Sequence, residues 1–235
     1  MNALHLATSK RADRVRQMFT DIAPTYDRLN HLLSGNRDKA WRRVAVTMLQ
    51  PQPRERLVDL CGGTGDLALE CLRQQPQARV VVADFSHTML RLAQAKLPRA
   101  THAHTADALR LPYTDAAFDA VTVGFGVRNF EDPARGLREI RRVLKPGGKL
   151  LVLEFFKPSS RVMALVFGRL FRWMLPLVGR VVSGHSFAYL YLPESVGEFV
   201  TLREFEALLN RANFAVEATR SLDGGIACAI VAVAA

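Results

Sequence analysis

The sequence predicts an α/β protein with a Rossmann-like sheet, and three observations support this prediction. First, residues 59–66 form a glycine-rich turn between a short apolar run and a segment with helical spacing of apolar residues. Second, further apolar runs alternate with helical patterns along the chain, as in a parallel sheet. Third, 235 residues of which 49% are hydrophobic suffice for one domain with a sizeable core. We therefore expect helices on both faces of a single sheet.

The N-terminal residues read as a helical cap. In residues 10–20, Val15, Met18 and Phe19 fall on one face of a helix that is otherwise rich in arginine. The net charge of +10 has its excess in the first 56 residues. No basic run is interleaved with aromatic residues, so this charge favours a membrane surface over nucleic acid as a partner. We expect residues 1–50 to cover a cleft.

The glycine turn predicts a site for a nucleotide-containing ligand. Gly63 and Gly65 allow positive φ and close approach to the backbone, and Thr64 suits the first turn of the following helix. Residues 63–68 also satisfy the dinucleotide pattern G-x-G-x-x-A, which is weak evidence alone. Asp59 would repel a pyrophosphate but attract the ammonium and sulfonium groups of S-adenosylmethionine. The turn therefore favours S-adenosylmethionine over NAD.

Two acids follow the next strands. Asp84 ends the apolar run 79–84, where a carboxylate can bind two adjacent ribose hydroxyls. Asp107 follows the weakly alternating run 101–107, where it can accept from an adenine amino group. Both acids should stand at the same edge of the sheet as the glycine turn.

Cysteine and histidine spacing argues against a metal framework. Cys61, Cys71 and Cys228 are neither paired by spacing nor accompanied by ligand-spaced histidines, which indicates a reducing compartment. His102 and His104 would share one face of a strand, but no third ligand stands nearby. We expect no metal, and a cytoplasmic protein without a signal peptide or membrane span.

Candidate catalytic residues follow the fourth predicted strand. Arg128 and Asn129 leave the carboxyl end of the run 118–126, where α/β enzymes place reactive groups. A helix over 133–144 leads to a fifth strand over 149–155. This completes a cofactor-binding core over residues 51–157.

The remaining chain departs from the alternation of strands and helices. Residues 158–200 hold apolar segments punctuated by arginines such as Arg169 and Arg172, which predicts an apolar lid or membrane-interface insertion. Simple packing of an extra helix is the alternative. Residues 201–235 predict a helix and then an antiparallel hairpin whose turn contains two glycines.

Three motifs taken together identify a family. They are residues 26–30 with Ser34, Trp41 and Arg42; residues 124–129 with 142–155; and residues 186–195. From about residue 15 to residue 233, the chain resembles the ubiquinone/menaquinone biosynthesis C-methyltransferases, which are Class I methyltransferases. The resemblance implies a seven-stranded Rossmann-like sheet with an N-terminal helical cap and a helical insertion after strand 5.

The resemblance also implies the site. S-adenosylmethionine would contact Thr64, Asp84, Asp107, Ala108 and Gly124, with S-adenosylhomocysteine as the product and no metal. The family usually carries serine at the position of Gly124, so one hydrogen bond should be missing here. Further departures in the N-terminal signature, which affect the quinone entrance, are Gly35, Asn36 and Asp38.

The implied reaction is methylation of a ring carbon of a reduced polyprenyl quinol. Carbon is a weak nucleophile unless a ring hydroxyl is ionised, and a cation beside the oxygen favours ionisation. Arg128 is the candidate to stabilise this phenolate, and Asn129 to orient the hydroxyl or a water. Tyr26 and Asp27 would close the cleft, with Asp27 as proton acceptor the weaker hypothesis.

Several alternatives stay open at this point. Residues 189–195 lie nearer the menaquinone branch, which favours demethylmenaquinol over a benzoquinol of ubiquinone biosynthesis. An NAD-dependent reductase and a non-catalytic membrane-associated scaffold are less favoured functions. We expect transient contact with the inner face of the membrane, and the sequence leaves a homodimer open.

Overall fold

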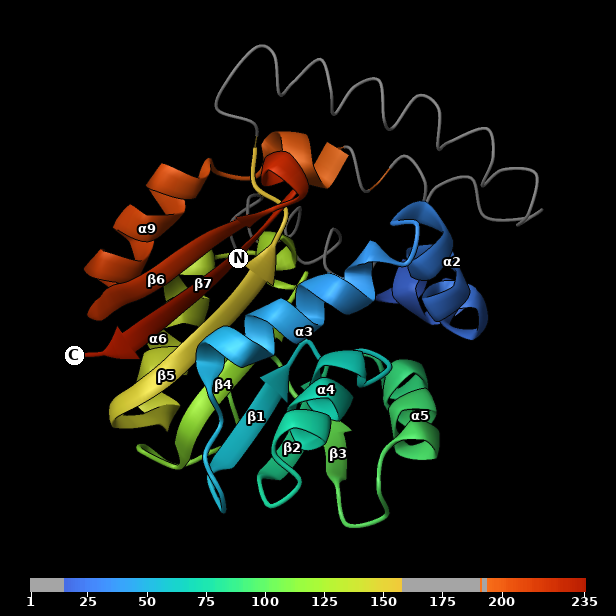
Figure 1. Cartoon of the computed structure of the whole chain (residues 1–235), viewed down its shortest axis with the longest axis horizontal. Helices are drawn as coiled ribbons and strands as arrows, with labels where there is room; N and C mark the ends of the chain where they lie inside the picture. The colour runs from blue at the N-terminus through green and yellow to red at the C-terminus, as the bar shows by residue number, and fades with distance from the viewer. Residues whose placement is uncertain (1–14, 158–190, 192–193) are drawn as a thin grey trace, which may run out of the picture.

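A seven-stranded mixed sheet forms the centre of the computed structural model, which describes residues 15–157, 191 and 194–235 (Figure 1). The strand order is β3-β2-β1-β4-β5-β7-β6. The strands are β1 (Arg56–Leu60), β2 (Arg79–Asp84), β3 (His102–Thr105), β4 (Phe118–Gly124), β5 (Leu144–Glu154), β6 (Phe214–Leu222) and β7 (Ala227–Ala234). Strands β1 to β5 pair in parallel, and β7 is antiparallel to both β5 and β6.

The sheet is covered by helices on both faces. Residues 15–22 are helical and lead into η1 (Ala23–Thr25), α2 (Tyr26–Leu33), α3 (Arg37–Leu49), α4 (Asp66–Gln74), α5 (His87–Lys96), η2 (Val127–Asn129), α6 (Pro133–Val143), α9 (Leu202–Arg211) and η3 (Asp223–Gly225). Helices α3 and α4 lie on one face of the sheet and α6 on the other (Figure 1).

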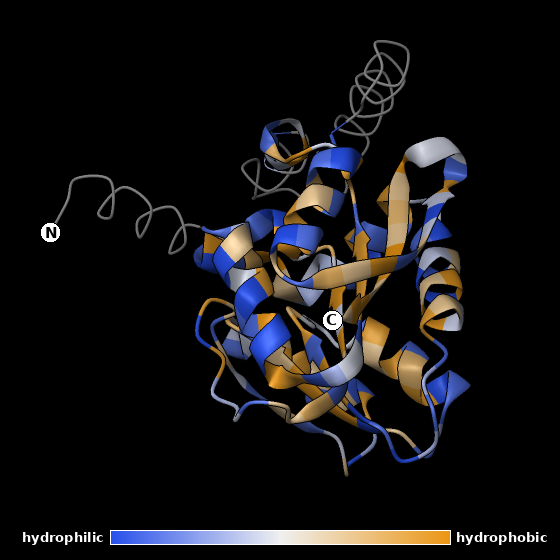
Figure 2. Cartoon of the chain, turned by 90° about the vertical axis from the view of Figure 1, so that its left-hand side faces the viewer, coloured by the Kyte–Doolittle hydropathy of each residue, from blue (hydrophilic) through white to orange (hydrophobic). Residues whose placement is uncertain are grey.

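Alternation along the strands divides the core into two layers. In β5, Leu150 packs with Ile140 of α6 and with Phe205 of α9 in one apolar cluster. Its neighbour Leu151 packs with Trp41 of α3 in the other cluster. Successive side chains of a strand point to opposite faces, so a strand buried on both faces reads as a continuous apolar run. Figure 2 shows this apolar colouring along the central strands.

The topology creates a crevice at the carboxyl ends of the strands. Strand β1 pairs with β2 on one side and with β4 on the other, so the chain leaves β1 and β4 in opposite directions. Open α/β sheets bind their ligands at such a switch point. The glycine turn follows β1, and the residues around Asn129 follow β4, so both meet there.

Most of the predicted architecture is confirmed. The C-terminal hairpin is present as β6 and β7, whose turn contains Gly224 at φ 70°. Strand β5 begins at Leu144, five residues earlier than predicted, because Leu144 pairs with Phe118 across a register shift. The predicted insertion over 158–200 lies mostly outside the described residues, so its lid or interface role stays a prediction. Among the described residues, no helix has the length and apolar character needed to cross a membrane.

Helix α3 is anchored to the β6–β7 turn by one carboxylate. Trp41 Nε1 donates to Asp223 Oδ2 at 2.6 Å, and Arg37 of α3 pairs with the same carboxylate. The Arg37 hydrogen bond holds the pKa of Asp223 below its ordinary value. This contact holds α3 in place, and the cap helix α2 directly precedes α3 in the chain.

Replacing the carboxylate by an amide tests this anchor. Asp223→Asn should lower the free energy of unfolding by about 1 kcal/mol at about pH 7, because a charge-assisted hydrogen bond becomes a neutral one. A depressed pKa stabilises the fold above the unfolded-state pKa, and this stabilisation is lost as the pH falls through the folded-state pKa. The difference between variant and wild type in urea denaturation should therefore shrink towards about pH 3.

The control is Glu217→Gln, which alters an exposed ion pair with Lys149 and should change stability little. An Asp223→Asn effect that is equal at both pH values would contradict the electrostatic anchor.

Candidate active site

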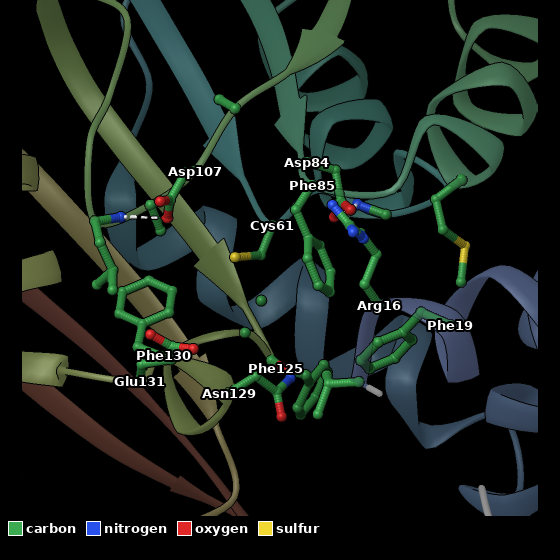
Figure 3. Close-up of a pocket in the computed structure, with 18 of the residues that line it drawn as sticks. Arg16, Phe19, Cys61, Asp84, Phe85, Asp107, Phe125, Asn129, Phe130 and Glu131 are labelled. Atoms are coloured by element: carbon green, nitrogen blue, oxygen red, sulfur yellow. Dashed lines mark hydrogen bonds between the residues drawn. The ribbon is translucent and has the colours of Figure 1, made fainter. Parts of the chain in front are cut away.

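A cavity of about 280 Å³ opens at the carboxyl ends of β1, β2 and β4, beneath the cap (Figure 3). The cap contributes Val15, Arg16, Phe19 and Tyr26 to its lining. The sheet edge contributes Cys61, Gly63, Asp84, Phe85, Met89, Ala106, Asp107, Ala108, Leu109, Gly124, Phe125, Gly126, Asn129, Phe130 and Glu131. Seven of the residues predicted from sequence thus meet at one cavity.

Asp84 organises the glycine turn from the end of β2. Its Oδ2 accepts from Gly63 N at 2.9 Å, and its Oδ1 accepts from Ser86 N at 2.8 Å. Burial raises the pKa of Asp84, and these N–H groups oppose that rise by stabilising the charged form. Gly63 has φ 54°, and a Cβ built there would meet nothing within 4 Å, so the backbone is open to a ligand. The turn therefore presents a fixed carboxylate beside accessible backbone.

The second side of the cavity lies after β3 and β4. Asp107 Oδ1 accepts from Leu109 N at 2.8 Å, which fixes the carboxylate at the rim beside Ala108. A Cβ at Gly124 would stand 3.2 Å from Leu67 Cδ2, so a larger residue would need Leu67 to shift. The missing serine at Gly124 thus coincides with close packing against α4.

Asp59 lies beneath the turn and is absent from the cavity lining. Its Oδ1 accepts from Thr122 Oγ1 at 2.7 Å, and its Oδ2 accepts from Ala68 N at 3.1 Å. Burial raises the pKa of Asp59 to about 7. Asp59 holds the start of α4 against β4, in contrast to the prediction that its charge lies directly beside the ligand.

Asp27 joins the cap to the glycine turn. Its Oδ1 accepts from Thr64 Oγ1 at 2.5 Å, and its Oδ2 pairs with Lys96 at the end of α5. Lys96 Nζ also lies 2.7 Å from Asp66 Oδ1, at the start of α4. Asp27 and Thr64, which were predicted to act in different parts of the site, are therefore direct partners, and neither is among the lining residues. An acid committed to a hydroxyl and an ammonium is poorly suited to accept a substrate proton.

The link continues into α3 through buried charges. Arg42 Nη1 lies 2.5 Å from Asp38 Oδ2 and 3.4 Å from Asp66 Oδ2. Asp38 also accepts from Ser34 Oγ at 2.8 Å, and it lies 2.8 Å from His31 Nδ1. Burial acts to raise the pKa of Asp38, but the hydrogen bonds from Ser34 and Arg42 bring it below its ordinary value.

These contacts account for the departures in the N-terminal signature. Gly35 and Asn36 both have positive φ, at 59° and 63°, in the turn from α2 to α3, and glycine and asparagine tolerate that conformation best. Asp38 is the partner of Arg42. His31, Asp38 and Asp66 lie close enough to hold a metal ion, but Arg42 already bridges the two carboxylates. His102 and His104 were not expected to bind a metal, and in the structure His104 Nε2 lies 2.8 Å from the Tyr113 hydroxyl.

Arg128 lies behind the cavity. Its Nη1 is 2.6 Å from Glu154 Oε1, whose side chain is fully buried, and 2.6 Å from the carbonyl oxygen of Phe125. Its guanidinium lies 5.7 Å from the ring centroid of Phe155. Phe125 has φ 55°, which is strained for an aromatic residue. Arg128 thus secures this strained turn, and it is absent from the lining that Asn129 reaches.

Tyr26 and Asn129 complete the lining. Tyr26 meets Phe19 edge to face, with 5.9 Å between ring centroids. Burial raises the pKa of Tyr26, so its phenol stays protonated near neutral pH. Asn129 Oδ1 accepts from the Tyr191 hydroxyl at 2.6 Å.

Lys96, Glu154 and Tyr191 support the site but were not among the predicted site residues. The role of Glu154 could have been predicted from sequence. A carboxylate that ends an apolar strand beside the site is buried, and a buried charge needs a partner of opposite sign. Lys96 and Tyr191 could not be predicted in this way, because their partners Asp27 and Asn129 are distant in sequence. Lys96 was known only as the end of a helix, and Tyr191 only as part of a family motif.

Removing the cap anchor should loosen the cap. Asp27→Ala deletes the contacts to Thr64 and Lys96, so amide hydrogen exchange in α2 should accelerate about tenfold or more. Exchange read by mass spectrometry over residues 26–33 measures this. Asp21→Ala, which removes an exposed contact to Gln17, is the matched control. Equal exchange in α2 in wild type and Asp27→Ala would show that the cap is held by other contacts.

The ion pair between Arg128 and Glu154 can be tested by substitution. Arg128→Met leaves the Glu154 carboxylate buried without its cation, which should cost about 3–5 kcal/mol of unfolding free energy. Adding Glu154→Gln removes that charge and should recover most of the loss, as measured by chemical denaturation. A single variant that loses less than about 1 kcal/mol would mean that the pair is not a stabilising unit.

The chain matches one family model and several known proteins over most of its length. The profile described as the ubiE/COQ5 methyltransferase family matches residues 7–234. A demethylmenaquinone methyltransferase of Thermus thermophilus is 46% identical over 202 residues, covering 85% of this chain and 92% of that protein. One from Deinococcus radiodurans is 44% identical, covering 91% and 89%. A ubiquinone/menaquinone biosynthesis C-methyltransferase of Geobacter sulfurreducens is 41% identical, covering 93% and 88%.

Solved structures share the fold at low identity. A SAM-dependent methyltransferase of Thermotoga maritima has a TM-score of 0.65 at 19% identity, covering 93% of this chain and 99% of that one. The [4+2]-cyclase SpnF has a TM-score of 0.69 at 18% identity, covering 93% and 94%. Since a cyclase shares the architecture, these structures speak for the fold alone.

Proposed function

Because this chain belongs to the ubiE/COQ5 methyltransferase family, we propose that it methylates a ring carbon of demethylmenaquinol in menaquinone biosynthesis. As a member, it is an S-adenosylmethionine-dependent C-methyltransferase of quinone biosynthesis. Three of its relatives carry the name demethylmenaquinone methyltransferase, which favours the naphthoquinol head group. The observation that carries the proposal is the cavity in which Asp84 and Asn129 line opposite sides under the cap.

The lining fits S-adenosylmethionine, whose bound form supplies an electrophilic methyl group on a positively charged sulfur. The Asp84 oxygens each accept one backbone N–H and have a second lone pair for a ribose hydroxyl. Asp107 at the rim suits an adenine amino group, and Ala108 and Met89 offer apolar surface to the base. Gly63 leaves backbone exposed for close approach of the cofactor.

The neighbouring aromatic residues suit a flat quinol ring. Phe19 from the cap, Phe125 and Phe130 all line the cavity, and Figure 3 shows Phe130 on the side away from Phe19. Aromatic rings pack well against one another in offset or edge-to-face arrangements. Closure of the cap through Asp27 would exclude water from the reacting groups, which strengthens every electrostatic contact inside.

The residues after β4 would activate the ring. A quinol hydroxyl with a pKa near 10 is mostly protonated at neutral pH, and hydrogen bonds to the charged form favour its ionisation. We assign this contact to Asn129, which lines the cavity. Arg128 supports the same turn from behind, and its charge is largely balanced by Glu154. This assigns Arg128 a positioning role in place of the direct phenolate contact expected from sequence.

Tyr26 and Asp27 take separate roles in this proposal. Tyr26, kept neutral by burial, packs at the ring side of the cavity and helps to orient the substrate. Asp27 closes the cap and does not serve as the proton acceptor, because Thr64 and Lys96 occupy its two oxygens. Membrane contact through residues 158–200 remains part of the proposal on sequence grounds alone.

Product analysis tests the function. The protein is incubated with S-adenosylmethionine and a reduced mixture of short-chain demethylated naphthoquinol and benzoquinol, and the products are weighed by mass spectrometry. We expect one methyl group to be gained by the naphthoquinol. Methylation of the benzoquinol alone would assign the chain to the ubiquinone branch, and methylation of neither would refute a quinol substrate.

Asn129→Ala tests the activating contact. Loss of one donor to a developing oxyanion typically costs about 100-fold or more, so kcat/KM should fall by about that factor. S-adenosylmethionine affinity, measured by calorimetry, should stay near that of wild type. Asn210→Ala, on the exposed face of α9, is the matched control. Unchanged kcat/KM in Asn129→Ala would remove this residue from the mechanism.

A further inference from the structure

The Asn129 amide has one orientation that its neighbours allow. The Tyr191 hydroxyl donates to Asn129 Oδ1 at 2.6 Å, which is a normal O–H···O distance and short for an N–H···O bond. Asn129 Nδ2 lies 3.4 Å from the carbonyl oxygen of Phe125. Reversing the amide would place two acceptors, Oδ1 and that carbonyl, against each other. The oxygen of the amide is therefore committed to Tyr191, and Figure 3 shows it pointing away from the Cys61 side of the cavity.

Tyr191 is held firmly enough to impose this orientation. Its side chain is only 8% exposed and packs with Val15 and Met18, with Phe19 and Phe85 at the edge of the same cluster. Phe125, on the other side of the amide, is fixed because its carbonyl also accepts from Arg128 at 2.6 Å. The amide thus hydrogen-bonds to two partners that are themselves held by further contacts.

We propose that Tyr191 is a positioning residue that commits Asn129 to donate from Nδ2 to the quinol oxygen. This inference rests on the proposed function. In this orientation Asn129 presents Nδ2 to the cavity, and an amide nitrogen can donate to an oxygen but cannot take a hydroxyl proton. Donation favours the ionised oxygen, whose proton has passed to solvent. Nδ2 carries two hydrogens, and the 3.4 Å contact to Phe125 uses at most one of them.

Tyr191→Phe removes the hydroxyl and keeps the ring in the cluster. We expect kcat to fall about tenfold at neutral pH, and the midpoint of the pH–kcat curve to move about one unit upward, since less of the bound quinol is ionised. The KM for S-adenosylmethionine should be unchanged. In an Asn129→Ala background, Tyr191→Phe should have no further effect, because Tyr191 acts through Asn129.

Tyr113→Phe is the matched control. Its hydroxyl also makes one partly buried contact, to His104 Nε2 at 2.8 Å, but the residue is absent from the cavity lining. It should leave the pH–kcat curve in place.

Two results would overturn the inference. Either kcat and its pH midpoint are unaltered in Tyr191→Phe, or the loss is equally large with and without Asn129. Both results leave the proposed function standing, provided that wild type methylates the quinol. Absence of methylation by wild type would instead remove the function on which the inference rests.

Discussion

The contact of Asp27 with Thr64 and Lys96 is the constraint on which the rest of the site depends. One carboxylate joins the cap helix α2 to the glycine turn and to the end of α5. The chain of charges continues through Asp66 and Arg42, so each partly buried charge has a partner, as buried ions require. Because of this link, Tyr26 and Phe19 of the cap line the same cavity as Gly63 of the sheet.

A second constraint acts across the cavity, where β4 ends. The positive φ of Phe125 is costly, and the side chain of Arg128 compensates by binding the Phe125 carbonyl, pairing with Glu154 and lying over Phe155. The consequence is a fixed Asn129. The family motif thus contains one residue that reaches the cavity and one that supports it, and the two need different tests.

The features that could be predicted from sequence are those that depend on neighbouring residues and on the order of the strands. Gly63, Asp84 and Asp107 lie at the cavity, and their positions were predictable because they depend on strand ends and on the switch point of a parallel sheet. The family and the seven-stranded fold were also predicted, and both are confirmed. The directions of Asp59 and Arg128 were not foreseen, since a strand-end position does not say whether a side chain faces a ligand or a buried partner. The contact of Asp27 with Thr64 was equally hidden, because it joins elements 37 residues apart.

A crystal structure of the protein with S-adenosylhomocysteine and a demethylated naphthoquinol analogue tests the central claim most directly. This claim is that the cap and the glycine turn form one site through Asp27. We expect the ribose hydroxyls on Asp84, the analogue beside Asn129 Nδ2, and Asp27 still in contact with Thr64. A complex in which both ligands are bound while Asp27 has left Thr64 would contradict it.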